Sequence, residues 1–204
     1  MGVKGMDQYF SPENDALPSK RRTFFCQIGG MNFEFVTDTG VFSKSGLDYG
    51  SRTLLEAILP EISGCVLDIG CGYGPIGIAI AKKSNTDVTM TDINPRAVKL
   101  AEENASINKV KVDIIEGDGY GNISGSFDWI VTNPPVRAGK KVFYPWLENA
   151  GSRLKPEGTL VFVLKKDQGA LSAMKHLGAF YGEIGILMKK SGYYVVKCKK
   201  GLTN

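Results

Sequence analysis

The run Asn133-Pro134-Pro135-Val136 contains the residue types that most clearly suggest chemistry. Two successive prolines restrict the backbone, so the side-chain amide of Asn133 and the neighbouring carbonyl point toward one spot. Such oxygen acceptors can hold the hydrogens of an amino group and aim its lone pair at an electrophile. The alternative is a Pro-Pro turn that only ends a strand. We predict a reaction centre here, with Asn133, Pro134 and Pro135 as its catalytic residues.

A glycine-rich loop at 68–77 follows an apolar, strand-like run. Its glycines, among them Gly70, Gly72 and Gly74, allow the backbone to approach a ligand closely. Such a loop is weak evidence alone, because it also occurs in NAD sites, phosphate sites and tight turns. Asp92 ends the next strand-like run, where a carboxylate can accept hydrogen bonds from both hydroxyls of a ribose. Together, the loop and the carboxylate indicate a nucleoside cofactor.

Asp68 bears on which nucleoside cofactor fits. It places an acid just before the glycines, where the diphosphate of NAD would need to lie against a helix N-terminus. A carboxylate there suits the cationic sulfonium and ammonium groups of S-adenosylmethionine better than a diphosphate. The alternative is that Asp68 only holds backbone amides of the loop, which is compatible with the same fold. We expect S-adenosylmethionine as the cofactor.

Asp118 and Gly119 follow a third strand-like run. At a strand end beside the same crevice, the Asp118 carboxylate could accept a hydrogen bond from the amino group of adenine. An Asp-Gly pair is also a common turn former. The residues alone leave these two interpretations equally open.

The elements that must position these residues alternate between short apolar runs and helical spacing. Near-continuous apolar strands separated by helices are typical of a parallel sheet covered on both faces. The carboxyl ends of parallel strands share one edge, so the chemistry-bearing residues should meet there. Strands are predicted at 65–69, 87–91, 112–115, 127–132 and 159–164, and helices at 51–59, after Pro75, after Asn94-Pro95, at 146–154 and at 170–179.

Two further segments predict antiparallel pairs. Runs at 23–28 and 31–36 flank Gly29-Gly30 and should form a hairpin, and runs at 183–188 and 193–198 should pair at the end of the chain. The predicted fold class is α/β: a doubly wound, seven-stranded, mostly parallel sheet with an antiparallel last strand, plus a small N-terminal β-hairpin. We expect a flexible N-terminus at 1–20 and one domain at 21–204, with the hairpin appendage at 21–38.

Composition narrows the class of protein. The 204 residues are 43% hydrophobic, which suits one globular domain, and no apolar run approaches the roughly 20 residues that span a bilayer. The four cysteines are scattered without metal-binding spacing, so we expect free thiols, no metal and a cytoplasmic location without membrane contact. The net charge is only +4, but basic residues cluster at 20–22, 137–141, 165–166 and 189–190. Such clusters attract phosphates or are simply solvated faces.

Taken together, these motifs resemble the class I methyltransferases, and within them the "methyltransferase small" family, to which ribosomal RNA guanine-N2 methyltransferases belong. The resemblance covers residues from about 40 to 200. The Asn-Pro-Pro element alone also occurs in adenine-N6 and glutamine-N5 methyltransferases. The segments that carry the resemblance are 40–44, 47–51, 68–74, 92–94, 133–135, 137–140 and 165–170.

The resemblance implies a role for each matched residue. The methionine end of S-adenosylmethionine would lie against Asp68, Gly70, Gly72 and Gly74. The ribose would be held by Asp92 with Ile93, and the adenine by Asp118 with Gly119. Lys44, Asp48 and Ser51 would close over the amino-acid part of the cofactor. Asn133 would contact both cofactor and substrate, and Val136, Arg137 and Lys140 would face the substrate.

The sequence departs from the family pattern at Val136, where many amino methyltransferases carry a Tyr or Phe that stacks on the target base. We expect any stacking to come from elsewhere, with Phe143 and Tyr144 as candidates. The N-terminal domain of the longer ribosomal relatives is also missing from the sequence, so docking would fall to the hairpin and the basic clusters.

The sequence as a whole predicts an S-adenosylmethionine-dependent N-methyltransferase acting on an exocyclic amino group, with guanine N2 in ribosomal RNA as the leading target. The expected partner is therefore RNA, as ribosomal RNA or a ribosomal particle. One alternative is a protein glutamine N5-methyltransferase, against which the basic residues after the Asn-Pro-Pro element argue. Another is a non-catalytic, cofactor-binding module for RNA assembly.

Overall fold

The computed structural model describes residues 18–43, 46–83 and 86–201. Most of the segment predicted to be flexible, 1–20, and the candidate cofactor residue Lys44 lie outside these ranges.

The main element is a seven-stranded sheet with the strand order β5-β4-β3-β6-β7-β9-β8. The pairs β5–β4, β4–β3, β3–β6 and β6–β7 are parallel, and β9 runs antiparallel to both of its neighbours. This confirms the predicted fold class. The strands are β3 (Cys65–Ile69), β4 (Asp87–Asp92), β5 (Asp113–Glu116), β6 (Phe127–Thr132), β7 (Leu154–Lys165), β8 (Glu183–Lys190) and β9 (Tyr193–Lys199).

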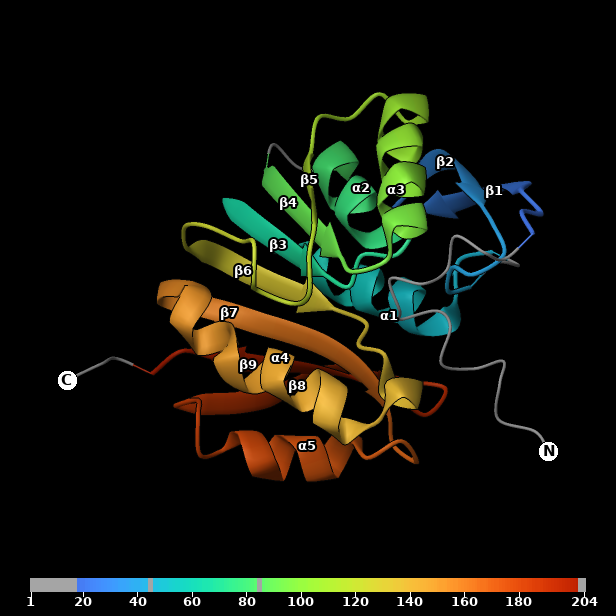
Figure 1. Cartoon of the computed structure of the whole chain (residues 1–204). Helices are drawn as coiled ribbons and strands as arrows, with labels where there is room; N and C mark the ends of the chain where they lie inside the picture. The colour runs from blue at the N-terminus through green and yellow to red at the C-terminus, as the bar shows by residue number, and fades with distance from the viewer. Residues whose placement is uncertain (1–17, 44–45, 84–85, 202–204) are drawn as a thin grey trace.

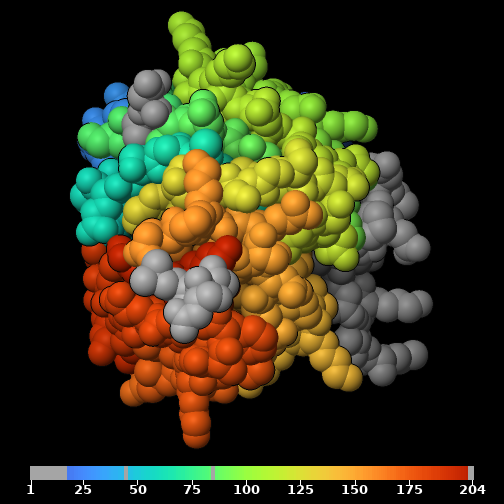
Figure 2. All heavy atoms as spheres, turned by 90° about the vertical axis from the view of Figure 1, so that its left-hand side faces the viewer, coloured from blue at the N-terminus to red at the C-terminus, as the bar shows by residue number. Residues whose placement is uncertain are grey.

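Helices cover the two faces of the sheet unequally. The helices α1 (Tyr49–Ile58), α2 (Pro75–Lys83) and α3 (Pro95–Ile107) lie on one face, and α4 (Lys140–Arg153) and α5 (Ala170–Leu177) lie on the other (Figure 1). The glycine-rich connection 117–126 contains no helix, so a hollow lined by Thr89, Asp113 and Ile115 remains over β4 and β5. The sheet is covered by helices on both faces, as predicted, except for this hollow at the β4–β5 edge. Figure 2 shows the amino-end side of the sheet, with colours passing from green at the top to red at the bottom.

Most element boundaries follow the signals in the sequence. The Asn94 side chain accepts a hydrogen bond from Arg96 N at 3.0 Å and caps α3, as predicted. The largest difference is α4, which begins at Lys140 instead of Trp146 and includes Pro145. Proline normally marks a helix start, but burial of Phe143 and Leu147 on the inner face of α4 outweighs the missing N–H.

The N-terminal hairpin forms a separate two-stranded sheet of β1 (Arg22–Ile28) and β2 (Met31–Thr37), joined at Gly29-Gly30 as predicted. Both glycines have positive φ (54° and 82°), which this two-residue turn requires. Phe33 and Phe35 are buried, with their rings 5.7 Å apart, in the core shared with α1–α3. The hairpin is thus packed into the hydrophobic core.

Two asparagines of α3 pair with the free edge of β2. Asn104 accepts from Val36 N at 2.7 Å and donates to Val36 O and to Tyr73 O, both at 2.9 Å. One turn later, Asn108 accepts from Glu34 N at 3.3 Å and donates to Glu34 O at 2.7 Å. These side chains satisfy backbone groups that another strand would otherwise have to pair.

Replacing Asn104 by Ala should therefore destabilise the fold strongly. The change leaves the buried N–H and C=O of Val36 and the carbonyl of Tyr73 without partners, and each buried unsatisfied group costs roughly 1–3 kcal/mol. We expect urea unfolding to show a loss of about 3 kcal/mol or more. Asn108→Ala is the matched control with a smaller loss, because Glu34 is half-buried and water can replace the amide. Equal losses for both variants would contradict this account.

Candidate functional site

The candidate site lies at the carboxyl ends of β3, β4, β5 and β6, on the side of the molecule where α1 and the hairpin lie (Figure 1). The loop after β3 is fixed to β4 because Gly70 N and Cys71 N both donate to Thr91 O, at 2.9 and 3.0 Å. On the other side, the Thr132 hydroxyl donates to Ile69 O at 2.8 Å and holds the end of β6. The loop therefore has a fixed position between its two neighbouring strands.

The three loop glycines are required for different reasons. All have positive φ: 71° at Gly70, 59° at Gly72 and 90° at Gly74. A Cβ on Gly70 would lie 2.8 Å from the Trp146 ring, and one on Gly74 would lie 2.8 Å from Ile78, so packing also excludes a side chain there. A Cβ on Gly72 would meet nothing within 4 Å. Gly72 is thus the glycine that borders open space.

Asp92 connects this loop to the start of α3. Its Oδ2 accepts from Gly72 N at 2.8 Å and its Oδ1 accepts from Asn94 N at 2.9 Å. Burial raises the pKa of this carboxyl, while hydrogen bonds from backbone amides act in the opposite direction. Each carboxylate oxygen keeps further acceptor capacity, which is what a pair of ribose hydroxyls would need.

Asp68 is fully buried beneath the loop. Its Oδ2 accepts from Gly77 N in the first turn of α2 at 2.9 Å, which is the backbone role considered from the sequence. Its Oδ1 is also buried and has no hydrogen-bond partner among the described residues. Burial raises the pKa of Asp68 to about 7, and the nearby Asp92 charge acts in the same direction. A cationic group would relieve both effects, so the carboxyl suits the positively charged end of S-adenosylmethionine.

Asn133 follows β6 and is oriented by the start of α1. Its Nδ2 donates to Asp48 Oδ1 at 3.1 Å and to Ser51 Oγ at 3.0 Å. The same Asp48 oxygen caps α1 by accepting from Gly50 N and Ser51 N at 2.9 and 3.1 Å. A carboxylate only accepts, so the NH₂ end of Asn133 must face Asp48. The Asn133 carbonyl oxygen is therefore left at the opposite end of the amide as an acceptor.

The two prolines that follow form a tight turn. Pro135 has φ −74° and ψ 71°, and Val136 N donates to Pro134 O at 2.8 Å, which is the geometry of an inverse γ-turn. The Pro134 carbonyl thus uses one lone pair inside the turn and keeps one. The short 3₁₀ helix η3 (Val136–Ala138) then leads to Gly139 and α4.

Asp118 and Gly119 lie in a turn, because Gly121 N donates to Asp118 O at 3.0 Å. The turn borders an open hollow that Trp146 also lines, and a Cβ on Gly119 would lie 2.9 Å from Trp146 Nε1. Trp146 thus packs against both Gly70 and Gly119. Sequence reasoning missed this residue as part of the site, because it placed the start of α4 at Trp146 and gave the ring no partner.

The structure shows whether the two aromatic candidates, Phe143 and Tyr144, could stack on the target base. Phe143 is only 1% exposed and cannot stack on a base, so that candidate was wrong. The Tyr144 ring packs against His176 at 5.0 Å, and its hydroxyl is buried without a partner among the described residues. Arg137 and Lys140 are exposed, and Val136 is half-buried.

The fold and this arrangement of residues at the strand ends define a class I S-adenosylmethionine-dependent methyltransferase. A family model described as "Methyltransferase small domain" matches residues 32–197. The chain belongs to this family.

Relatives agree with this assignment. YbxB of Bacillus subtilis is 40% identical over 200 residues, which cover 96% of this chain and all of YbxB. Ribosomal RNA small subunit methyltransferase C of Aeromonas hydrophila is 41% identical over 143 residues, covering 68% of this chain and 42% of that protein. The T. thermophilus 16S rRNA N2 methyltransferase RsmC, solved with AdoMet and guanosine, superposes with a TM-score of 0.82 at 28% identity, covering 91% of this chain and 52% of that one. The chain thus spans about half the length of the two named methyltransferases.

Over residues 18–43, 46–83 and 86–201, no helix has the length and apolar character to cross a membrane. The same ranges contain no group of three or more His, Cys, Asp or Glu side chains that could hold a metal ion.

The pKa of Asp68 predicts an unusual pH dependence of stability. A folded-state pKa of about 7 exceeds the ordinary 3.8, so the native state retains a proton that the unfolded chain loses between these values. Asp68 therefore lowers stability progressively as pH rises from about 4 to 7. Asp68→Asn keeps an acceptor for Gly77 N but cannot ionise. In urea unfolding without cofactor, its stability relative to the parent should be higher at pH 8 than at pH 5 by on the order of 2 kcal/mol. An equal difference at both pH values would contradict the raised pKa.

Proposed function

We propose that this protein transfers a methyl group from S-adenosylmethionine to the exocyclic N2 amino group of guanine in ribosomal RNA. The observation that carries the proposal is the orientation of Asn133. Asp48 and Ser51 hold its NH₂ end, so its carbonyl oxygen is available as an acceptor, and the Pro134 carbonyl of the following turn keeps a lone pair for a second hydrogen bond. Two fixed acceptors are what an amino group with two hydrogens requires. The RNA methyltransferase names among the relatives support RNA as the substrate class.

The cofactor supplies an electrophilic methyl group. We propose that Asp68 and the glycine loop receive its methionine end and that Asp92 with Ile93 receives the ribose. Asp118 with Gly119 would receive the adenine, although their backbone also forms a turn. The open space beside Gly72 and the unpartnered Oδ1 of Asp68 fit these roles.

The chain's own contribution to the reaction is positioning. The guanine amino hydrogens would be accepted by Asn133 Oδ1 and Pro134 O, which directs the nitrogen lone pair toward the methyl carbon. The N–C bond would form as the methyl–sulfur bond breaks and S-adenosylhomocysteine leaves. Both acceptors stabilise the nitrogen as it becomes positive, and water can take its proton afterwards. Asp48 and Ser51 act through Asn133 and are positioning residues. No strong base is required from the protein.

Guanine N2 lies on the Watson–Crick edge, so the target must be unpaired or turned out of a helix to enter the crevice. The exposed cations Arg137 and Lys140 directly follow the reaction-centre turn and would face the RNA phosphates. They favour RNA over a protein glutamine as substrate. We place the reaction in the cytoplasm, on ribosomal RNA free or in a ribosomal particle.

The substrate proposal predicts one missing modified nucleoside. Ribosomal RNA from cells lacking the gene should lose N2-methylguanosine at one position, and the purified protein should restore it with S-adenosylmethionine. Mass spectrometry of ribosomal RNA nucleosides and fragments measures both results. An unchanged nucleoside profile, with no methyl transfer to that RNA in vitro, would sink the substrate proposal.

The mechanism predicts that Asn133→Ala slows the chemical step. It removes one preorganised acceptor but keeps the proline-fixed backbone, so single-turnover methyl transfer at saturating cofactor should fall about a hundredfold or more. The fold and most of the cofactor affinity should survive, which circular dichroism and calorimetry would check. Methyl transfer at nearly the parent rate would refute the mechanism.

A charge test provides the control. Asn133→Asp keeps an acceptor but places two carboxylates against each other where Asp48 now accepts from an amide, so activity should be low. Adding Asp48→Asn removes one of the two negative charges, and the Asn oxygen can still cap α1. The double variant should recover part of the lost rate. If it is no faster than Asn133→Asp alone, repulsion by the Asp48 charge is not the cause of the loss.

A further inference from the structure

A pair of tyrosines lies directly beside the reaction centre. Tyr49 is the first residue of α1 and adjoins Asp48, whose carboxylate holds Asn133. Its ring lies 5.5 Å from that of Tyr193 with an interplanar angle of 36°. Tyr193 begins β9, so the pair joins the start of α1 to the turn between β8 and β9.

The pair is held in place from behind. The Tyr49 hydroxyl is 2.8 Å from Ser191 Oγ, and the Tyr193 ring packs against the start of α1, where a Cβ on Gly50 would lie 3.0 Å from Cε1. The turn itself is fixed to the end of β7 because Lys166 N donates to Gly192 O at 2.9 Å. Yet the Tyr49 side of the pair is open: Tyr49 is 38% exposed, and Tyr193 is its only ring neighbour among the described residues.

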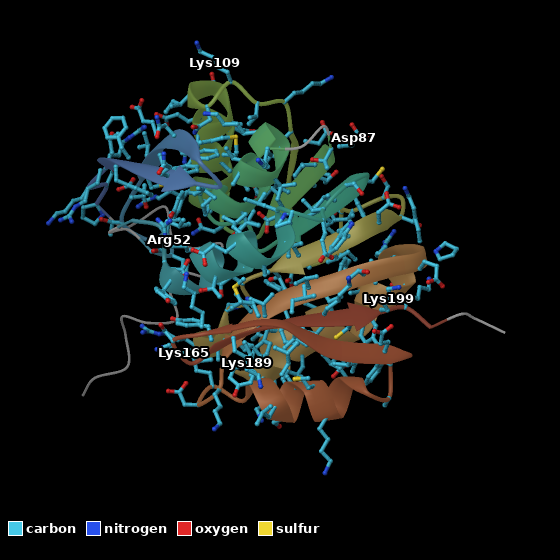
Figure 3. All side chains as sticks on the ribbon, turned by 180° about the vertical axis from the view of Figure 1, so that it is seen from behind. Arg52, Asp87, Lys109, Lys165, Lys189 and Lys199 are labelled. Carbon is cyan, nitrogen blue, oxygen red and sulfur yellow. The ribbon has the colours of Figure 1, made fainter. Side chains whose placement is uncertain are left out.

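A lysine lies against one ring of the pair. Lys165 Nζ lies 5.1 Å from the Tyr193 ring centre and has no carboxylate partner within the described ranges, and Lys166 is exposed next to it. The other charges nearby are a third lysine, Lys190, which is paired with Glu56, and the exposed acid Asp167, which lies two residues after Lys165 in the sequence. Figure 3 shows Lys165 and Lys189 near each other at this end of the sheet, with Lys199 at the far end of β9.

We propose that Tyr49, supported by Tyr193, stacks on the unpaired RNA base that flanks the methyl acceptor, and that Lys165 contacts the adjoining phosphate. This inference rests on the proposed RNA methyltransferase function. The reaction-centre turn carries the aliphatic Val136, Phe143 is buried and Tyr144 packs inward, so Tyr49 is the exposed ring nearest in the chain to the groups that hold Asn133. An exposed aromatic ring next to unpaired cations is the combination that binds single-stranded RNA.

The test uses a short single-stranded RNA carrying the target guanine, with fluorescent 2-aminopurine as its neighbour and S-adenosylhomocysteine present. Stacking on Tyr49 should quench the fluorescence on binding. Tyr49→Leu removes the π face and should weaken binding about 5- to 150-fold, whereas Tyr49→Phe, which loses only the contact with Ser191, should stay close to the parent. Methyl transfer to free guanosine should be unchanged in both variants.

Lys189 provides the matched control for Lys165. Its Nζ lies 5.1 Å from the Tyr194 ring, but Tyr194 packs in the core on the α4–α5 face, whereas Tyr193 packs on the α1 face. Lys165→Ala should reduce the salt dependence of RNA binding by about 0.7 in the log–log slope, and Lys189→Ala should not.

Full quenching and parent affinity in Tyr49→Leu would overturn the inference, as would an equal loss in Tyr49→Phe or in guanosine methylation. These failures differ from failure of the proposed function. If the protein methylates the RNA and Tyr49→Leu has no effect, only the proposed stacking on Tyr49 is wrong. If the protein methylates no RNA, the proposed function is wrong, and the quenching assay still shows whether Tyr49 binds a base.

Discussion

The Asp48 carboxylate is the interaction on which the site depends. One oxygen accepts from two backbone amides at the start of α1 and from the Asn133 amide. The same atom therefore begins a helix and sets which end of the Asn133 side chain faces the crevice. Because α1 packs on β7, β8 and β9 while Asn133 directly follows β6, the contact also joins the two halves of the sheet across the site.

The candidate cofactor site combines fixed backbone with two buried carboxyls. Asp68 and Asp92 both have raised pKa values because burial disfavours their charge, and both accept from amides of the glycine-loop segment. Ionisation of these two buried carboxyls is therefore unfavourable. A cation bound beside them would convert that cost into affinity, which supports the proposal that they lie at the binding site of a sulfonium cofactor.

Local signals predicted much of this arrangement. β3 and β6 match their expected bounds, and Asn94 caps α3, because apolar runs and caps depend on neighbouring residues. Contacts between residues far apart in the sequence could not be predicted. Nothing in the sequence indicates that the Asn133 amide contacts Ser51 or that Trp146 packs on Gly70 and Gly119. Asp48 and Ser51 were named for the cofactor, but the contact that the structure gives them is with Asn133. Tertiary packing of Phe143 also outweighed the helix-start signal of Pro145.

The asparagine pair on α3 has a consequence for how this chain could be shortened. Asn104 donates hydrogen bonds both to Val36 in β2 and to the Tyr73 carbonyl of the glycine-rich loop, so this side chain connects the hairpin directly to the loop. A protein trimmed to begin after Thr37 would keep every residue of the crevice, yet it would expose the apolar surface that Phe33 and Phe35 cover and leave the Asn104 amide half unpaired. A minimal version of this enzyme therefore has to retain the hairpin, even though the hairpin lies outside the seven-stranded sheet.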